Sequence, residues 1–197
     1  YSYQIWITKA INWFNNMNNL QMKKNLTHAL KFGAISGAIM IIGWFATHQL
    51  FTNEDGGFDM ASSEILGYSA MLLAFVAVFI GVKNYRDKQL DGHITFGKAF
   101  LIGLYTVLVT TFIYVVGWMI YFPNFMPDFA DQYMASQITA LEESGITGAE
   151  LQAQKEEMAS FMEWYKQPIN MIGMTIMEIL PIGLIVAAVS ALVWKKK

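Results

Sequence analysis

The sequence contains no cysteine, only four prolines in 197 residues, and few charged side chains. The absence of cysteine excludes disulfide bonds, thiol nucleophiles and thiolate metal sites. Charged residues make up 14% of the chain, against about 25% in an ordinary soluble domain, whereas hydrophobic residues make up 55%. The net charge of −2 provides no basic excess for binding the phosphates of nucleic acid. The composition therefore favours a membrane protein and argues against a nucleic-acid partner.

Four long apolar runs stand out from the rest of the chain. They cover residues 32–51, 65–82, about 99–122 and 169–194. Each run reaches or nearly reaches the roughly 20 residues that a helix needs to cross a hydrocarbon core of about 30 Å. The helices of a soluble bundle would each show a polar face, and these runs show none. We therefore predict an all-α membrane protein with four transmembrane helices embedded in a lipid bilayer.

Basic residues are distributed unequally between the two sides of this predicted membrane domain. Of the thirteen Lys and Arg, all but Lys155 and Lys166 fall on the side that holds both termini and the segment between the second and third runs. Because Lys and Arg are retained in the cytoplasm during insertion, both termini are predicted to be cytoplasmic. Loops 52–64 and 123–168, which are rich in acidic residues, are then external and, in a bacterium, periplasmic.

The external segment 123–168 is predicted to form an amphipathic helical hairpin between the third and fourth transmembrane helices. Apolar residues recur at helical spacing on both sides of Gly145, which is a natural helix stop. Thr147 is a natural N-cap for the second helix of the pair. Two such helices would pack together or lie on the outer leaflet.

The first 21 residues differ from the rest of the chain. They are rich in asparagine and are followed by Met22-Lys-Lys, which resembles an ordinary bacterial start before a membrane helix. Residues 1–21 are therefore predicted to be an N-terminal extension, and residues 22–197 to form a single four-helix transmembrane domain. The alternative for residues 1–21 is a helix that lies on the membrane surface through Trp6, Trp13, Phe14 and Met17.

A series of short motifs occurs in order along the chain. They are Gly67-Tyr-Ser-Ala-Met71, Tyr85-Arg-Asp-Lys88, Gly92-His-Ile-Thr-Phe-Gly-Lys-Ala-Phe100, Tyr114 with Trp118, Pro127-Asp-Phe129, Tyr133, and Thr175-Ile-Met-Glu-Ile-Leu-Pro-Ile-Gly183. With these motifs, residues 22–197 resemble the bacterial membrane proteins of the domain of unknown function 4199 family. The resemblance implies a Gram-negative inner-membrane protein, and it implies no reaction because that family has none assigned. Its motifs contain Arg86, Asp128 and Tyr133, which we take as a candidate partner surface.

Glu178 is the most informative single residue because it lies inside the fourth apolar run. A carboxylate there costs about 2.5–3.5 kcal/mol on insertion scales, so the side chain should face the bundle interior or water and be neutral. Pro181 frees the carbonyl of Met177 and predicts a kink beside Glu178. With no Lys or Arg at this depth, the expected hydrogen-bond partners are backbone groups or hydroxyls, the hydroxyls being those of Thr106, Thr110, Thr111, Tyr114 and Thr175. Glu178 is then either a proton or cation site, or a strut that joins two helices.

Small residues form smooth stripes on the predicted helices. Gly33 and Gly37 lie one turn apart on the first helix, and Gly183 and Ala187 do the same on the fourth. In lipid, helices associate through close backbone contact, so small residues mark contact faces. We expect these faces to pack within one bundle, and the alternative is a contact in a homo-oligomer.

The sequence shows no catalytic constellation. It has no serine–histidine–acid order and no glycine-rich phosphate loop. His28 and His93 fall on the predicted cytoplasmic side and His48 near the external end of its helix, so the three histidines cannot share a metal ion. The alternative is a site at the inner surface made by His28 and His93 with Asp87 or Asp91. We therefore predict no catalytic residue, metal or cofactor.

Two functions from different classes remain open. The first is a non-catalytic accessory or scaffold subunit of a bacterial cell-envelope complex, with other membrane or envelope proteins as partners. The second is a small transporter or proton-coupled subunit that works through Glu178, and an enzyme acting on lipid-linked substrates is a weaker third. Few polar residues inside the runs and no evident inverted repeat favour the first.

Overall fold

The computed structural model describes the backbone of residues 2–51 and 60–196, and the side chains of residues 19–51, 62–129 and 131–196. This part of the chain contains six α-helices, and its one β-feature is the single bridge between Ile94 and Lys196. The helices are α1 (Ser2–Phe51), α2 (Met60–Gln89), α3 (Phe96–Phe125), α4 (Phe129–Glu143), α5 (Gly148–Tyr165) and α6 (Pro168–Trp194). The predicted all-α class is confirmed.

Four of these helices are long and apolar enough to cross a membrane. The candidate spans are Asn19–Phe51, Ser62–Gln89, Phe96–Phe125 and Pro168–Trp194. They contain the four predicted apolar runs. The first three spans are longer than the runs because their helices continue into polar residues at the ends, whereas the fourth adds only Pro168. The prediction of four apolar spans is confirmed, and the chain is a multi-pass membrane protein.

The outward faces of the spans carry large apolar side chains with little contact inside the chain. Ile42 is 66% exposed and Phe112 is 70% exposed, and the same is true of Leu72, Ile185 and Leu192 at lower values. In water, continuous apolar faces of this kind would drive association. In a bilayer they are the surface that meets the lipid tails.

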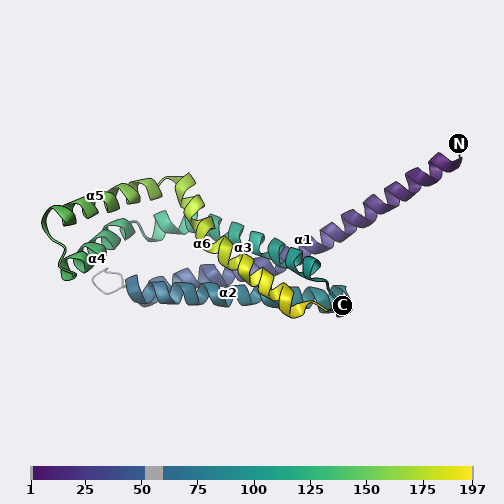
Figure 1. Cartoon of the computed structure of the whole chain (residues 1–197), viewed down its shortest axis with the longest axis horizontal. Helices are drawn as coiled ribbons and strands as arrows, with labels where there is room; N and C mark the ends of the chain where they lie inside the picture. Colours follow the sequence, from purple (N-terminus) through teal and green to yellow (C-terminus); the bar gives the residue numbers. More distant parts are fainter. Residues whose placement is uncertain (1, 52–59, 197) are drawn as a thin grey trace.

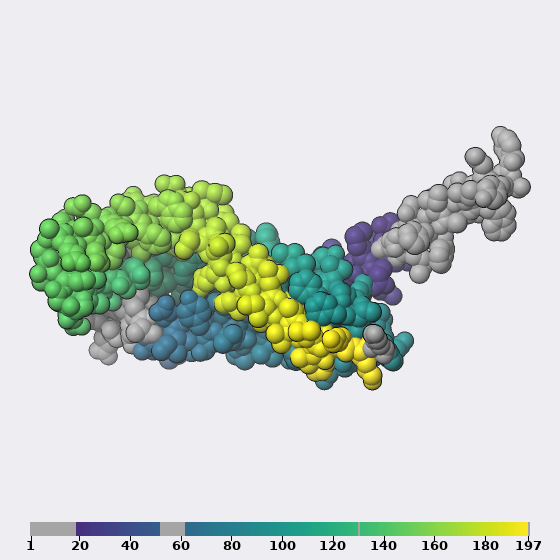
Figure 2. Space-filling model, viewed as in Figure 1, coloured from purple at the N-terminus to yellow at the C-terminus, as the bar shows by residue number. Residues whose placement is uncertain are grey.

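The four spans lie side by side, and the α4–α5 pair lies at one end of the bundle (Figure 1). Helix α1 packs on α2 and α3, while α6 packs on α3 and α2. The α2–α3 turn and the C-terminus lie at the opposite end, where the N-terminal part of α1 projects beyond the bundle (Figure 1). The space-filling view shows the α4–α5 pair, in green, standing beyond the ends of the blue and yellow spans (Figure 2).

Helix α1 continues without a break through the predicted boundary at Met22. Just before that boundary, Gln21 Nε2 donates a hydrogen bond of 2.7 Å to the hydroxyl of Tyr85 on α2. The packed part of α1 therefore already includes the last residue of the predicted extension. The side chains of residues 1–18 lie outside the described residues, as do residues 52–59 of the predicted first external loop.

The α2–α3 turn is tied to the C-terminal tail. Asp91 and Gly92 reverse the chain with φ of 50° and 83°, a region that glycine enters at little cost. Ile94 and Lys196 then exchange two backbone hydrogen bonds of 2.9 Å. Thr95 caps α3 by accepting a bond from the Lys98 amide. The two ends of the chain segment 94–196 therefore meet on one side of the bundle.

Helices α4 and α5 are joined by residues 144–147 and pack on each other. Gly145 adopts φ of 89° and ends the first helix of the pair, where a helix stop was expected. Thr147 is the N-cap of α5 but makes no side-chain capping bond. The next residue, Gly148, has a φ of 65°, so the first turn of α5 is not the regular one that a capping side chain serves. Lys155 Nζ lies 3.7 Å from Glu142 Oε1 across the pair.

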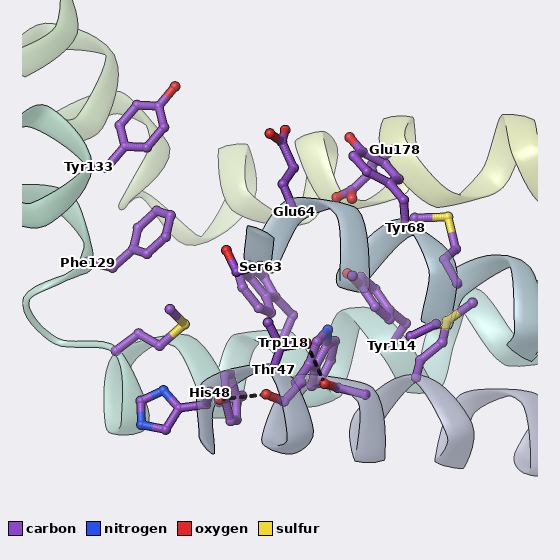
Figure 3. Close-up of a pocket in the computed structure, with 18 of the residues that line it drawn as sticks. Thr47, His48, Ser63, Glu64, Tyr68, Tyr114, Trp118, Phe129, Tyr133 and Glu178 are labelled. Carbon is purple, nitrogen blue, oxygen red and sulfur yellow. Dashed lines mark hydrogen bonds between the residues drawn. The ribbon is translucent and has the colours of Figure 1, made fainter. Parts of the chain in front are cut away.

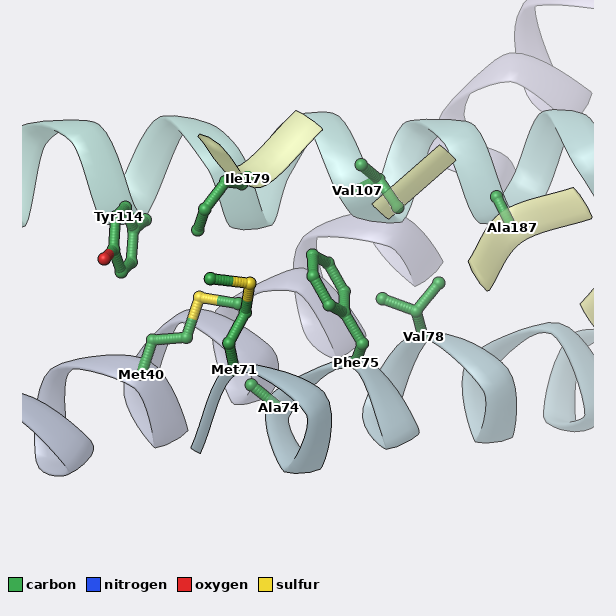
Figure 4. Close-up of a cluster of buried hydrophobic side chains, with 9 residues drawn as sticks. All are labelled: Met40, Met71, Ala74, Phe75, Val78, Val107, Tyr114, Ile179 and Ala187. Carbon is green, nitrogen blue, oxygen red and sulfur yellow. The ribbon is translucent and has the colours of Figure 1, made fainter. Parts of the chain in front are cut away.

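The core of the bundle lies where α2, α3 and α6 meet (Figure 4). Phe75 and Val78 of α2 pack there against Val107 of α3 and Ile179 of α6, and all four side chains are buried. This contact holds α6 against the rest of the bundle and so decides which way its remaining residues point.

The glycines of α1 allow it to approach α3 closely. A β-carbon on Gly33 would lie 2.6 Å from Val109 Cβ, and one on Gly37 would lie 2.6 Å from Ile113 Cγ2. Neither distance is compatible with a side chain in the present packing. The glycine stripe of α1 therefore faces a neighbouring helix of the same chain.

The small residues of α6 have the same role against α3. A β-carbon on Gly183 would lie 2.5 Å from Val107 Cγ1. One turn later, Ala187 Cβ lies 3.0 Å from the place where Gly103 would carry a β-carbon. A small residue on each side lets the two helices touch, as is usual for helix contacts in membranes.

Candidate functional site

A cavity of about 500 Å³ lies at the end of the bundle where the α4–α5 pair is attached. All six helices contribute to its wall (Figure 3). The lining residues are Met40, Gly43, Trp44, Thr47 and His48 of α1; Ser63, Glu64, Gly67, Tyr68, Ala70 and Met71 of α2; Tyr114, Trp118, Tyr121 and the following Met126 of α3; and Phe129, Tyr133, Ser136, Gln137, Tyr165 and Glu178 of α4–α6.

The packing of α6 directs Glu178 into this cavity. Thr175, Ile179 and Gly183 recur every four residues and form the buried stripe of α6. Glu178 precedes Ile179 by one position, which turns its side chain about 100° around the helix from that of Ile179. Its side chain therefore lies at the edge of the helix contact and is exposed to the cavity instead of being buried in the core.

The expected hydrogen bonds between Glu178 and neighbouring hydroxyls do not form. Thr175 Oγ1 donates to the Met171 carbonyl at 2.7 Å, and Thr110 Oγ1 donates to the Thr106 carbonyl at 2.9 Å. Threonine in a helix commonly satisfies its hydroxyl in this way, on the carbonyl one turn earlier. Among the described residues, Glu178 has no hydrogen bond and no ion pair. Bonds from Thr110 and Thr175 to Glu178 are therefore not among the hydrogen bonds of the described residues.

Tyr114 and Pro181, which were also predicted to belong to the intramembrane site, occupy different positions relative to Glu178. Tyr114 is 9% exposed and lines the cavity with Glu178. Pro181 lies inside α6, which is one continuous helix from Pro168 to Trp194. The structure thus brings Tyr114 and Glu178 to one cavity, and leaves Thr110 and Thr175 in the helix contacts behind it.

Glu64 is a second carboxyl group in the cavity, and the sequence interpretation did not single it out. It was assigned to the acidic external loop, whereas it lies on α2 one turn before Tyr68. Glu64 and Glu178 reach into the same space from α2 and α6, and they are close enough to interact electrostatically (Figure 3). The spacing of Glu64, Tyr68 and Met71 along one helical face was the signal that could have revealed it.

Aromatic side chains form much of the remaining wall. The ring of Trp44 lies 4.6 Å from that of Tyr114, 5.3 Å from that of Trp118 and 5.5 Å from that of Tyr121. Trp44 of α1 therefore packs on the rings of α3, and Trp44, Trp118 and Tyr121 all line the cavity.

Tyr165 closes the aromatic wall at the end of α5. The indole N–H of Trp118 donates to its hydroxyl at 2.8 Å, which ties α5 to α3. Burial raises the pKa of the Tyr165 hydroxyl, and the Glu178 carboxylate adds to the rise although the Trp118 hydrogen bond opposes it. Tyr165 is therefore a neutral hydroxyl at physiological pH.

The residues predicted as a partner surface are not together. Tyr133 lines the cavity and its ring stacks on that of Phe129 at 5.9 Å. Asp128 is exposed at the N-cap of α4 and makes no capping bond. Arg86 lies at the opposite end of the bundle, where it donates to Asp87 at 2.6 Å and packs over the Trp194 ring at 5.0 Å.

The histidines make separate contacts. His28 Nε2 lies 2.8 Å from the Gly81 carbonyl, whereas His93 Nδ1 lies 3.1 Å from the Asp91 carbonyl. His48 lines the cavity from α1. Within the part of the chain that the structure describes, no three His, Asp or Glu side chains gather as metal ligands would.

Comparison with known proteins identifies a family and no individual relative. The family model described as "Protein of unknown function (DUF4199)" matches residues 31–196. The matched segment includes every residue that lines the cavity. No curated protein and no solved structure matches the chain.

Proposed function

Since the chain belongs to the DUF4199 family of proteins of unknown function, its activity has to be argued from its site, and we propose that it is a small transport subunit. In this proposal a solute or a proton binds in the cavity, and Glu178 is the group that holds it. The observation that carries the proposal is that Glu178 reaches an open cavity and lacks a hydrogen bond or ion pair among the described residues.

The energetics of a carboxyl group in a span support this role. Placing a carboxylate near the middle of a membrane helix costs about 2.5–3.5 kcal/mol. A strut would recover part of that cost through hydrogen bonds to a neighbouring helix, and Glu178 makes none in the described structure. A glutamate kept without structural benefit is best explained by a ligand or a proton that it binds.

We further propose that the cavity faces the outside of a bacterial inner membrane. The α4–α5 pair and the cavity lie at one end of the bundle, and the α2–α3 turn and the C-terminus lie at the other (Figure 1). The second end carries most of the Lys and Arg, including Lys83, Lys88 and Lys98. The positive-inside rule places that end in the cytoplasm, with both termini, and the acidic α4–α5 pair in the periplasm.

A scaffold role is the second candidate, and the α4–α5 pair is the observation that favours it. Helix α4 packs on α5, and the pair is mostly exposed and acidic. Such a surface suits contact with another envelope protein, or with a second copy of the chain. Both candidates are non-catalytic roles in a cell-envelope complex, and they differ in whether Glu178 is needed.

Replacing Glu178 by glutamine separates the two candidates. Glu178→Gln keeps the shape of the side chain but cannot release a proton, and Glu163→Gln is the matched control, because Glu163 is exposed on α5 outside the cavity. Each variant is expressed in a strain lacking the gene, and its membrane level, thermal stability and rescue of the deletion phenotype are measured.

We expect both variants to fold with wild-type stability, but only Glu163→Gln to rescue the phenotype. Purified protein in liposomes with an internal pH-sensitive dye gives a second readout, in which Glu178→Gln should lower any protein-dependent proton flux to the level of empty liposomes. Full rescue by a stable Glu178→Gln protein would overturn the transport proposal and leave the scaffold role.

A further inference from the structure

The cavity combines aromatic rings with acidic groups, and this combination suggests a class of ligand. Resting on the proposed function, we propose that the cavity binds an organic cation: a quaternary ammonium or protonated amine with apolar substituents. The carboxyl groups of Glu64 and Glu178 would face the positive charge, and the rings around Trp44 and Tyr114 would surround the substituents.

The charged groups that line the cavity argue against an anionic ligand. Glu64 and Glu178 are the two acidic side chains of the described wall, and no Lys or Arg is among the described lining residues. Residues 52–61, which come shortly before the lining residues of α2 in the sequence, also contain no basic residue. Any negative charge on these carboxyl groups would repel an anion more strongly in a partly apolar site than in water. A cation placed between them would instead stabilise their ionised form.

Other titratable groups also face the cavity. They are His48 of α1 and the tyrosines of α2, α3, α4 and α5, namely Tyr68, Tyr114, Tyr121, Tyr133 and Tyr165. Tyrosine hydroxyls are neutral at physiological pH and can accept a hydrogen bond from an ammonium group. The tyrosines therefore add no charge to the wall, and its described carboxyl groups are those of the two glutamates.

The rings favour an organic cation over a metal ion. Trp, Tyr and Phe attract cations through the negative faces of their rings, and several rings around one ammonium group are the usual way in which proteins bind it. The Trp44 ring lies 4.6 Å from the Tyr114 ring and 5.3 Å from the Trp118 ring, so these rings are held in place before a ligand arrives. Two carboxyl groups without a third ligand are a poor site for a metal ion.

The size of the cavity also suits this class. A volume of about 500 Å³ falls within the range of roughly 300–1,000 Å³ that is typical of sites for small organic molecules. Glu178 lies beside the apolar core of α6, and Glu64 lies near the start of α2. A ligand with a charged centre and apolar arms fits both surroundings.

Binding of three probes that differ in charge tests the proposal. The full chain in lipid nanodiscs is titrated calorimetrically with benzyltrimethylammonium, benzyl alcohol and benzenesulfonate, with empty nanodiscs as the background. The cation should bind saturably, and the neutral and anionic probes should not. Glu178→Gln and Glu64→Gln should each weaken binding of the cation by about tenfold, and the control Glu163→Gln should leave it unchanged.

A pair of variants at Tyr133 tests the aromatic wall without disturbing the core, because Tyr133 lies on α4. Tyr133→Phe keeps the ring and should preserve binding of benzyltrimethylammonium. Tyr133→Leu removes the ring and should weaken binding by about threefold.

The possible outcomes separate this inference from the proposed function. Equal binding of benzyl alcohol or benzenesulfonate, no binding of benzyltrimethylammonium, or its undiminished binding by the double Glu64→Gln, Glu178→Gln variant would overturn the organic-cation assignment. Loss of rescue by Glu178→Gln would in each of those cases leave the transport proposal standing with another ligand. Full rescue by Glu178→Gln, together with the expected binding of benzyltrimethylammonium, would overturn the transport proposal and leave the organic-cation assignment standing.

Discussion

At the scale of the single residue, two adjacent residues of α6 have contrasting environments. Ile179 is buried in the core against α2 and α3, whereas Glu178 faces the cavity. A hydrophobic run of this kind shows that a glutamate is unusual, but it does not show which neighbours its side chain will meet. Three of the threonines expected to bind Glu178 donate their hydroxyls to carbonyls of their own helices instead, namely Thr106, Thr110 and Thr175.

The glycines of α6 provide a matched pair for measuring how tightly the residues pack. Gly183→Ala would place a β-carbon 2.5 Å from Val107 Cγ1 and 3.1 Å from the Phe75 ring, whereas Gly173→Ala meets no atom within 4 Å. We expect Gly183→Ala to lower the free energy of unfolding in mild detergent by about 1–3 kcal/mol, because overpacking forces neighbours to move.

Gly173→Ala should leave that free energy unchanged or slightly raised, because alanine favours the helix over glycine. Equal stability of the two variants would show that α6 does not approach α3 as closely as the structure has it. The comparison uses one helix and one chemical change, so differences in detergent or expression affect both variants alike.

At the scale of the element, the α4–α5 pair differs from the spans. The described side chains of α5 include one buried residue, Met162, whereas α3 and α6 each have a full buried stripe. Tyr165 is one link between the pair and the bundle, because it accepts the Trp118 hydrogen bond and packs on Phe122 at 5.6 Å. Elements with few buried contacts open at low free energy.

Hydrogen exchange should show this difference directly. We expect amides of α4 and α5 to exchange at least about tenfold faster than those of α2, α3 and α6 for protein in nanodiscs. Detergent-free nanodiscs serve to keep the spans protected by lipid. Protection of α4 and α5 equal to that of the spans would mean that a partner or a second copy covers them, which would favour the scaffold candidate.

At the scale of the whole molecule, the four spans alternate in direction and bring distant segments to common ends. The bridge between Ile94 and Lys196 places the α2–α3 turn beside the C-terminus, and the α4–α5 pair lies at the other end (Figure 1). This arrangement follows from four crossings, whichever end is cytoplasmic. The direction itself is argued from the excess of Lys and Arg at the first end.

Reporter fusions test that direction. A reporter that works in the cytoplasm should be active when fused after Lys197, and one that works only in the periplasm should be active when inserted at Gly145, in the α4–α5 turn. The reciprocal fusions are the controls and should be inactive. The opposite pattern at both positions would invert the orientation and would place the cavity on the cytoplasmic side.

The sequence by itself determined that this is a helical membrane protein of four spans, because crossing a bilayer requires long apolar runs and leaves little choice of backbone structure. It also determined that Glu178 lies in a span. Only the tertiary structure decided what Glu178 meets, because the rotation of α6 depends on the fit of Gly183 against Val107 and Phe75, which lie on other helices. The same packing brought Glu64 and the aromatic rings of α1 and α3 to one cavity, since no local pattern records which helices become neighbours.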